Sequence, residues 1–437
     1  MERREEISEW QKLPSSLQLQ FYKQVERETE RLRRMLHDLN KKLEGIKEYL
    51  KYRKIEKDYN WEELRVGVVD GSRSPIIDER LGGRYALFSS SYKIFEGKKL
   101  VDEGYKSGIL HPSDMRGATK FDILLTLLMT KLEREHAIEC LEKDVDWLLI
   151  DGSFFGFRIR SRMIREEERE DYVEWSETSE GKLEEKKEKI KGLIDYVAEK
   201  SLQLVKERKV VSIVKRVRNT AIDGFLLYNQ RKHIESAGNV DDCIQRIYKV
   251  VTGMPDKTLL SILMPPKSYF LYTDLFPDKE VGKFYHYSPL IGIYKKKVMG
   301  GKIEKVKDVL ERDCEDWMQR EVEGGIGQKY YNILLNEIVR GYFKAHEEAP
   351  VCCFEFSKDA LIDEMIDEIL SYMVEFNNPD TGHPFPLDLV DSDVSLPREF
   401  TREFVEEVEA SLMRKVVDLN LSKKLFYYLN PQAKWRT

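Results

Sequence analysis

The sequence is poor in cysteine, in long apolar segments and in net charge. Five cysteines occur in 437 residues, and no two of them form a CxxC pair. The odd number and the absence of a CxxC pair argue against a disulfide framework or a structural zinc site, and we expect a reducing, cytoplasmic setting. No apolar segment approaches the roughly 20 residues that a membrane helix needs, and the N-terminus lacks an apolar signal core. We therefore expect no membrane partner.

Charge and length leave a broad choice of function. The formal net charge of −6 excludes a surface coated with basic residues, but a local basic groove for nucleic acid is compatible with an acidic exterior. Hydrophobic residues make up 41% of the chain, enough for a sizeable core, and the length predicts one large domain with additions, or two domains. No low-complexity tract interrupts the chain, so we expect most of it to fold.

Two separate stretches end in the same three residues. VGVVDGSRS, residues 66–74, and LLIDGSFFG, residues 148–156, each carry an apolar run into Asp-Gly-Ser. Such runs are typical of buried strands, and chemistry collects at the carboxyl ends of strands in an open α/β sheet. If the two strands are neighbours, the carboxylates of Asp70 and Asp151 converge and repel each other. A hard cation such as Mg²⁺ or Mn²⁺ removes this repulsion, so the pair predicts a metal site, whereas a single Asp-Gly is typical of a simple turn.

A helix predicted over residues 120–143 offers a third carboxylate. At about 100° per residue, Glu133 shares a face with small residues, which let a helix lie close to a sheet. Glu135 lies nearer the edge of the apolar stripe. We predict Glu133 as the third ligand and keep Glu135 as the alternative, although glutamates also occur on ordinary solvated helix faces.

Residues 15–58 are predicted to form a helix with a leucine seam. Apolar residues recur there at alternating spacings of four and three: Leu32, Leu36, Leu39, Leu43, Ile46 and Leu50. We favour packing of this helix on its own domain over a dimerising coiled coil. Farther along, the highly charged residues 160–208 are predicted to form two helices joined near residue 180.

The second half of the chain mixes strands and helices. VVSIVKRVRNT, residues 210–220, predicts a strand that ends in basic residues, and residues 219–260 are predicted to be helical and loop-like. Further strands are predicted for LLSILM, KFYHYSPLIGIYKKK and VCCFEFS, which cover residues 259–264, 283–297 and 351–357.

The C-terminal part predicts a helix over residues 359–376, a loop rich in Pro and Asp over 378–397, and a closing helix from about residue 398. The order of elements along the whole chain predicts an α/β fold with a mixed β-sheet flanked by helices. Residues 1–60 would form an N-terminal helical extension. Residues 61–437 would form the main domain, which carries a charged helical insertion at about 160–208.

The order of five elements resembles the NurA nucleases, partners of the HerA helicase-translocase in DNA-end processing. These elements are a strand with DGS, a helix with Glu, a second strand with DGS, a strand ending in Lys, and GHPFPLDLVDSDV near the C-terminus. The resemblance implies an RNase H-like fold and a DNA nuclease that uses one or two Mn²⁺ or Mg²⁺ ions. It also implies 5′–3′ exonuclease and single-strand endonuclease activity, a homodimer and a HerA-type partner.

The resemblance also implies roles for single residues. Asp70 and Asp151 match the two metal aspartates of the family, and Glu133 or Glu135 matches its helix glutamate. Lys215 matches the strand-end lysine near the DNA phosphates. Arg73, which lies close to Asp70 in the sequence, and Arg216, which follows Lys215, are expected to contact DNA as well.

The last motif departs from the family pattern, which often reads Gly-Tyr-Pro-x-Pro-Leu with a His or Asp eight residues after the Tyr. Here His383 stands at the Tyr position and Asp391 at the later one. Asp391 is a good ligand for Mn²⁺ or Mg²⁺, and His383 is predicted as a catalytic residue that binds metal, contacts phosphate or carries a proton. A loop histidine without such a role is the alternative.

Two other functions are compatible with parts of the sequence. A catalytically degenerate NurA-like protein could clamp DNA or regulate the translocase, and the changes at His383 and Asp391 motivate this alternative. Actin-like ATPases and sugar kinases also carry Asp-x-Gly-Ser/Thr turns after strands. They need two related halves and a glycine cluster for adenosine, and neither is visible in the sequence.

Overall fold

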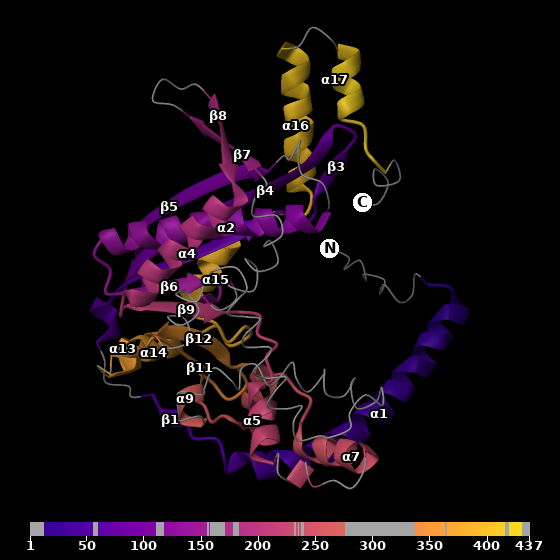
Figure 1. Cartoon of the computed structure of the whole chain (residues 1–437), viewed down its shortest axis with the longest axis vertical. Helices are drawn as coiled ribbons and strands as arrows, with labels where there is room; N and C mark the ends of the chain where they lie inside the picture. The colour runs from indigo at the N-terminus through magenta and orange to yellow at the C-terminus, as the bar shows by residue number, and fades with distance from the viewer. Residues whose placement is uncertain are drawn as a thin grey trace, which may run out of the picture.

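The computed structural model describes most of the chain, including Asp70 and Asp151. The described residues are 13–430 without 56–59, 111–117, 155–156, 158–170, 178–182, 231–232, 235, 237–239, 276–336, 363–364 and 416–418. A ten-stranded mixed sheet runs through this part of the chain (Figure 1). Helices lie on both of its faces, so the predicted α/β class with a mixed sheet is confirmed.

The five central strands have the order of an RNase H-like sheet. They are β5 (Lys99–Leu110), β4 (Gly83–Glu96), β2 (Arg65–Arg73), β6 (Trp147–Asp151) and β9 (Val210–Val214). β2, β6 and β9 run parallel, whereas β4 and β5 are antiparallel to their neighbours. The three parallel strands are almost wholly buried, which explains their continuous apolar runs. They also bring the two Asp-Gly-Ser stretches onto adjacent strands.

Five further strands extend the sheet. They are β12 (Cys352–Ser357), β11 (Ile338–Lys344), β10 (Ser268–Leu271) and β1 (Arg53–Lys54) beyond β9, and β3 (Asp78–Arg80) beside β4. The strand predicted over 351–357 is confirmed. The strand predicted over 259–264 is wrong, because most of this segment lies in α8 (Asp256–Leu263), and a short apolar run does not distinguish a strand from a buried helix. Residues 283–297 lie outside the described residues.

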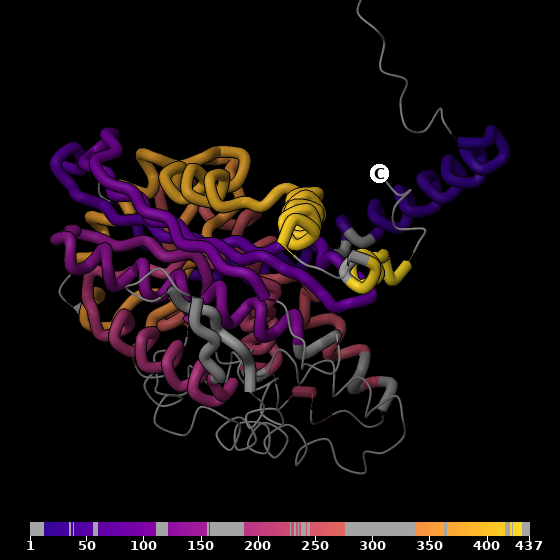
Figure 2. The backbone as a smooth tube through the Cα atoms, turned by 90° about the horizontal axis from the view of Figure 1, so that it is seen from above, coloured from indigo at the N-terminus to yellow at the C-terminus, as the bar shows by residue number. Residues whose placement is uncertain are grey.

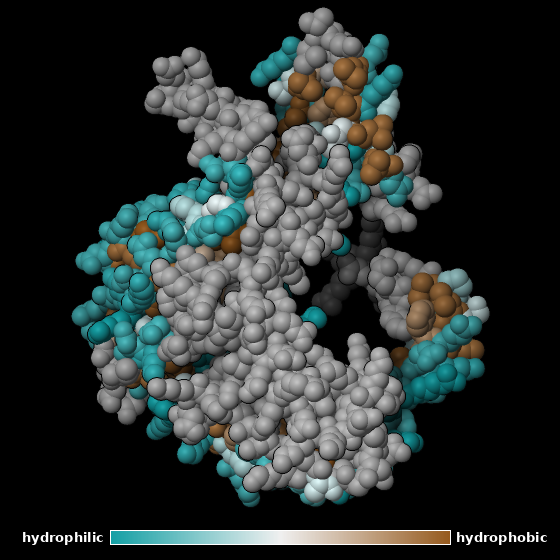
Figure 3. All heavy atoms as spheres, viewed as in Figure 1, coloured by the Kyte–Doolittle hydropathy of each residue, from teal (hydrophilic) through white to brown (hydrophobic). Residues whose placement is uncertain are grey.

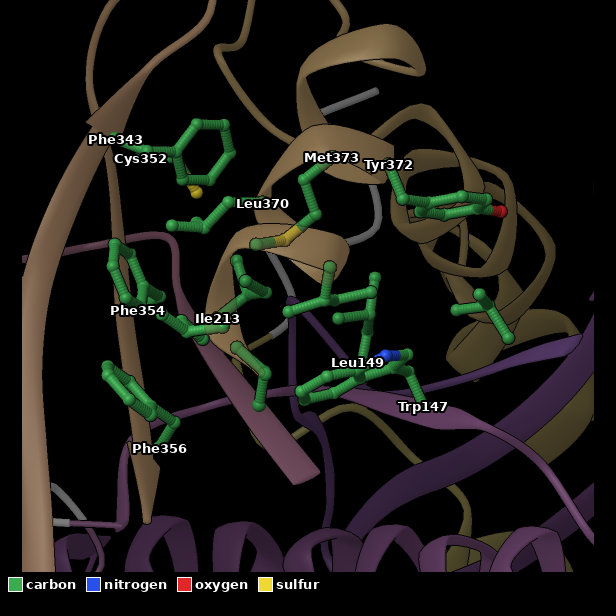
Figure 4. Close-up of a cluster of buried hydrophobic side chains, with 14 of the residues drawn as sticks. Trp147, Leu149, Ile213, Phe343, Cys352, Phe354, Phe356, Leu370, Tyr372 and Met373 are labelled. Atoms are coloured by element: carbon green, nitrogen blue, oxygen red, sulfur yellow. The ribbon is translucent and has the colours of Figure 1, made fainter. Parts of the chain in front are cut away.

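Helices pack on the two faces of the sheet (Figure 2). One face carries α2 (Ala118–Glu142) and α4 (Ile190–Lys206), and the other carries α14 (Ile366–Glu375) and α15 (Phe385–Val394). Alternate strand residues supply the two cores: Val68 packs with residues of α14 and α15, and Val69 packs with residues of α2 and α4. Figure 4 shows the α14 side, where Leu149 and Ile213 from the sheet meet Leu370 and Met373.

Two segments differ from their predicted structure near the C-terminus. The loop predicted over 378–397 is wrong for its centre, which forms α15. Pro384 caps this helix and Pro386 lies in its first turn, where a helix needs no backbone N–H. The prolines therefore start a helix. The helix predicted over 359–376 is broken into α13 (Lys358–Ile362) and α14.

The charged insertion is only partly helical. β7 (Asp171–Glu177) and β8 (Leu183–Lys189) form a separate two-stranded sheet, so the helix predicted before residue 180 is wrong for residues 171–177. Residues 160–170 lie outside the described residues. Tyr172, Val173 and Trp175 have the aromatic and β-branched character of strands, a local preference that the abundance of Glu and Lys obscures. The second predicted helix exists, but it begins at Ile190.

The N-terminal helix α1 (Ser15–Lys47) ends eleven residues before its predicted end. The second half of its leucine seam packs on the chain's own core, which confirms the favoured interpretation for Leu39, Leu43, Ile46 and Leu50. Leu32 and Leu36 in the first half are exposed. Figure 1 shows this half of α1 extending away from the sheet.

The remaining helices lie around the sheet. They are η2 (Trp61–Glu63), α5 (Ala221–Asn229), α7 (Val240–Val250), α9 (Tyr272–Leu275), α16 (Phe400–Lys415) and α17 (Leu419–Leu425). Figure 3 shows apolar side chains gathered over α16 and α17, where Leu421 and Leu425 are exposed. Within the described residues, no helix combines the length and the apolar character that crossing a membrane requires.

Candidate metal centre

Three aspartates from three elements meet at the carboxyl ends of the parallel strands. Asp70 lies in β2, Asp151 ends β6 and Asp391 lies in α15. One carboxylate oxygen of each lies within 4.8 Å of those of the other two. Side chains alternate along a strand, so Asp70 and Asp151 continue the rows of residues that face α14 and α15. The sheet therefore delivers two carboxylates to one point and α15 delivers the third.

Lys215 lies at the centre of these aspartates. Its ammonium Nζ is 2.6 Å from Asp70 Oδ2, 2.7 Å from Asp391 Oδ1 and 3.3 Å from Asp151 Oδ2. It directly follows β9, which places it on the same face as the two strand aspartates. The side chain of Asp70 is fully buried and that of Asp391 is 51% exposed, so the group opens to solvent on the α15 side.

The three aspartates and Lys215 together have more acidic than basic groups. Burial raises the pKa of Asp70 well above its ordinary value, and the charge of Asp151 raises it further, against the opposing effect of Lys215. Burial lowers the pKa of Lys215, but Asp151 and Asp70 outweigh it and hold that pKa above the ordinary range. Three carboxylates thus face one permanent ammonium, and the site attracts further positive charge.

Glu133 approaches the first Asp-Gly-Ser segment from the opposite face of the sheet. It lies in α2, and its side chain occupies the space above Gly71: a Cβ added there would lie 2.7 Å from Glu133 Oε1. The residue is buried, with 4% of its surface exposed. Among the described residues it stands outside the group of three carboxylates, so its role as a ligand stays a prediction.

The alternative glutamate points elsewhere. Glu135 accepts a hydrogen bond of 3.2 Å from the hydroxyl of Tyr196 in α4. Glu139, one turn later, pairs with Lys106 and Lys143. Of the three α2 glutamates, Glu133 is the one that lies against an Asp-Gly-Ser segment, which favours it over Glu135.

The helix that carries Asp391 is fastened to the sheet next to that residue. Asp393 accepts the ammonium of Lys93 at 2.7 Å and the hydroxyl of Tyr105 at 3.3 Å. Ser89 donates a hydrogen bond of 3.0 Å to the carbonyl of Val394. These contacts from β4 and β5 hold the last turn of α15, so Asp391 has a fixed position although its side chain is exposed.

His383 lies beside a different carboxylate. Its Nδ1 is 3.7 Å from Asp388 Oδ1, and its Nε2 is buried with no hydrogen-bond partner among the described residues. Asp388 also accepts hydrogen bonds from Asn378 and Thr381. The structure thus places His383 in the turn before α15, outside the three aspartates, and its catalytic role stays a prediction.

The two arginines expected to contact DNA closely follow Asp70 and Lys215 in the sequence. Arg73, at the end of β2, pairs with Asp122 of α2. Arg216 follows Lys215 and is exposed. The carbonyl of Lys215 accepts a hydrogen bond of 3.1 Å from Lys257, so a further cation lies behind this basic segment. Binding of DNA by these residues stays a prediction.

A buried ion pair next to Asp151 was not predicted from the sequence. Glu355 of β12 and Arg340 of β11 lie opposite each other in the sheet and contact the turn that follows β6. The signal was available, because a charged residue inside the apolar run VCCFEFS is rarely buried without a partner. The identity of that partner could not be predicted from the sequence, because it depends on the pairing of strands far apart in sequence.

Comparison with known proteins places this geometry in context. The family model of the NurA domain matches residues 64–396. The crystal structure of the NurA nuclease from Sulfolobus solfataricus is 14% identical, with a TM-score of 0.53, and the match covers 91% of this chain and 98% of that chain. A structure of NurA with manganese is 12% identical, with a TM-score of 0.43 and coverage of 91% and 99%. No curated protein matches the chain.

Proposed function

Because the chain belongs to the NurA family, whose domain spans residues 64–396, we propose that it is a metal-dependent DNA nuclease. The observation that carries this proposal is the meeting of three aspartates around one ammonium. Asp70, Asp151 and Asp391 offer only oxygen ligands, which suit Mn²⁺ or Mg²⁺. When bound, such an ion supplies an activated water and stabilises charge on the phosphate.

The residues present fit a divalent ion. The three carboxylates carry more negative charge than Lys215 neutralises, and their oxygens lie close enough together to share one ion. Mn²⁺ or Mg²⁺ would be held by these carboxylate oxygens, which Lys215 Nζ also contacts. The ammonium and the metal ion therefore compete for the same carboxylates. Released from them, Lys215 is free to contact a DNA phosphate at the open side of the site.

The first experiment is cleavage of end-labelled single- and double-stranded DNA with Mn²⁺, Mg²⁺ or EDTA. We expect cleavage with Mn²⁺ or Mg²⁺ and none with EDTA, and loss of cleavage in Asp391→Asn. Asp195→Asn is the matched control, because Asp195 is an exposed aspartate of α4 and should not matter. DNA binding without cleavage under every metal condition would replace the nuclease by a DNA clamp.

The finer parts of the proposal concern direction and partners. We propose 5′–3′ exonuclease and single-strand endonuclease activity in DNA-end processing, with a HerA-type translocase and as a homodimer. Support for an association surface comes from exposed apolar residues on the free half of α1, among them Leu19, Val25 and Leu36. Labelling either DNA end tests the direction. Light scattering of wild type and Val25→Asp, each alone and with the translocase, tests the assembly.

A further inference from the structure

The turn that follows Asp151 is held by a carboxylate from another strand. Glu355 Oε1 accepts a hydrogen bond of 2.8 Å from the Ser153 hydroxyl, and Glu355 Oε2 accepts one of 2.8 Å from the backbone N–H of Phe154. Ser212 of β9 donates to the carbonyl of Gly152. The turn is thus bound from two neighbouring strands, directly after the residue that supplies a carboxylate to the metal centre.

Arg340 completes this arrangement. Its Nε donates to Glu355 Oε1 at 2.8 Å, and its Nη2 donates to Ser153 Oγ at 3.0 Å. The side chain of Glu355 is fully buried and that of Arg340 is 11% exposed. Burying two charges is expensive, and replacing a buried pair with apolar residues is often neutral or stabilising. Stability alone is therefore a weak reason for this pair.

Glu355 acts from the side opposite to the metal centre. Phe354 and Phe356 on β12 pack in the core under α14, so Glu355 between them faces α4. Asp151 faces the α14 side, together with Asp70. Glu355 therefore holds the turn from behind, and its contacts fix the backbone from which the Asp151 carboxylate projects.

We propose that Glu355 and Arg340 are positioning residues that aim the Asp151 carboxylate at the metal ion. This inference rests on the proposed metal-dependent function. Partners of metal-ligating side chains typically change metal affinity by 10- to 100-fold when removed. Glu355→Gln keeps the size of the side chain and one acceptor oxygen but loses the charge that pairs with Arg340 and the second acceptor.

The test measures Mn²⁺ affinity by calorimetry without DNA, together with amide hydrogen exchange of residues 148–154 in EDTA. We expect Glu355→Gln to weaken Mn²⁺ binding about tenfold or more and to speed exchange in this segment. The control is Asp78→Asn, which breaks the equally buried Asp78–Arg80 pair at the far edge of the sheet. It should lower thermal stability and leave both readouts unchanged.

A double variant separates positioning from general damage. If Glu355 acts through Asp151, Glu355→Gln should have no further effect on Mn²⁺ affinity in an Asp151→Asn background. An equal effect in both backgrounds would overturn the inference, as would unchanged exchange of residues 148–154 in Glu355→Gln.

Two results separate the inference from the function on which it rests. If Glu355→Gln does not fold, Ser153→Ala removes the hydroxyl that both charges share and should give the same changes at smaller size. Failure of the wild type to bind Mn²⁺ would overturn the proposed function, while the exchange measurement would still decide whether Glu355 holds the turn.

Discussion

The two Asp-Gly-Ser segments have the same three residues but different structures. In the first, β2 continues through Gly71 to Arg73, and Gly71 still pairs with Ser90 of β4. In the second, β6 ends at Asp151, and Gly152 turns the chain with a φ of 98°. One segment is a strand that carries an aspartate, and the other is a turn that follows one.

This difference decides what holds each carboxylate in place. Asp70 pairs with Ser91 of β4, directly after the pairing of β2 with β6 ends at Val69, and it is fully buried. Asp151 pairs with Ile213 of β9, and the turn after it is held by side chains that reach it from β9 and β12. The same three residues therefore place their carboxylates at one site, although different contacts hold the two segments. Substitutions should affect the two segments in different ways.

The largest expected effect comes from Lys215, whose ammonium contacts both aspartates. Lys215→Met removes the ammonium that we propose to compete with the metal ion and to contact DNA. Mn²⁺ affinity should rise, by about tenfold, while the cleavage rate at saturating Mn²⁺ falls by about a hundredfold; both figures follow the range for groups beside a metal site. Calorimetry and single-turnover cleavage measure the two quantities. A parallel fall of both would contradict the competition between Lys215 and the metal.

The two glycines provide the next contrast. Gly152→Ala places a side chain at positive φ with no atom of the described residues within 4 Å, so it should cost about 1–3 kcal/mol of stability through backbone strain. Gly71→Ala adds a Cβ where Glu133 lies, so it should displace that carboxylate and lower cleavage about tenfold. Urea unfolding and cleavage rates distinguish the two effects.

Glu133→Ala is the control for this contrast. In that background Gly71→Ala should cause no further loss of cleavage, because the displaced carboxylate is already absent. A full additional loss would show that Gly71 matters for another reason, such as the approach of DNA.

The burial of Asp70 predicts a dependence of stability on pH. Its pKa in the folded protein is raised above the ordinary 3.8, so the native state keeps a proton that the unfolded state releases. Stability from this group is present below 3.8 and is lost as pH rises through the raised pKa, by up to about 1.4 kcal/mol per pH unit. Metal affinity changes in the opposite direction, since binding needs the ionised carboxylate.

Urea unfolding in EDTA between pH 4 and pH 8 tests this dependence. Asp70→Asn should flatten the fall in stability relative to the wild type, whereas Asp391→Asn, at the exposed edge, should retain it. Identical pH profiles of the wild type and Asp70→Asn would contradict the role assigned to the burial of Asp70.

The smallest effect concerns single hydroxyls. Ser90 donates a hydrogen bond of 3.0 Å to the carbonyl of Asp70, inside a strand that is already paired. Ser90→Ala should cost about 1 kcal/mol and leave Mn²⁺ affinity unchanged. Ser212→Ala removes a similar bond from the less supported second turn and should lower that affinity as well. Equal effects on affinity would remove the distinction between the two segments.

The sequence was sufficient for those parts of the fold that depend on local patterns. The apolar runs before Asp70 and Asp151 and the long, leucine-rich segment of α2 each predicted the correct element, because the length of a buried apolar segment distinguishes a strand from a helix. Pro384 and Pro386 misled the prediction, since proline breaks a helix interior but is well placed in a first turn.

The candidate site was predictable only in part, because some of its contacts depend on tertiary packing and not on local patterns. Strand ends could be read from the sequence, so Asp70 and Asp151 were found, and Lys215 and Asp391 followed from the family resemblance. Glu355 and Arg340 were missed because their contact with the second turn requires the pairing of β12 with β9 and β11. The side of the sheet from which Glu133 approaches depends likewise on tertiary packing.

The most direct test of the central claim is Mn²⁺ binding by wild type, Asp70→Asn, Asp151→Asn and the double variant, measured by calorimetry. If the two segments build one site, the wild type binds the ion and each single variant loses about a hundredfold or more in affinity. The double variant should then be little worse than either single one, because one site is lost only once. Wild-type affinity in either single variant would contradict a shared metal centre.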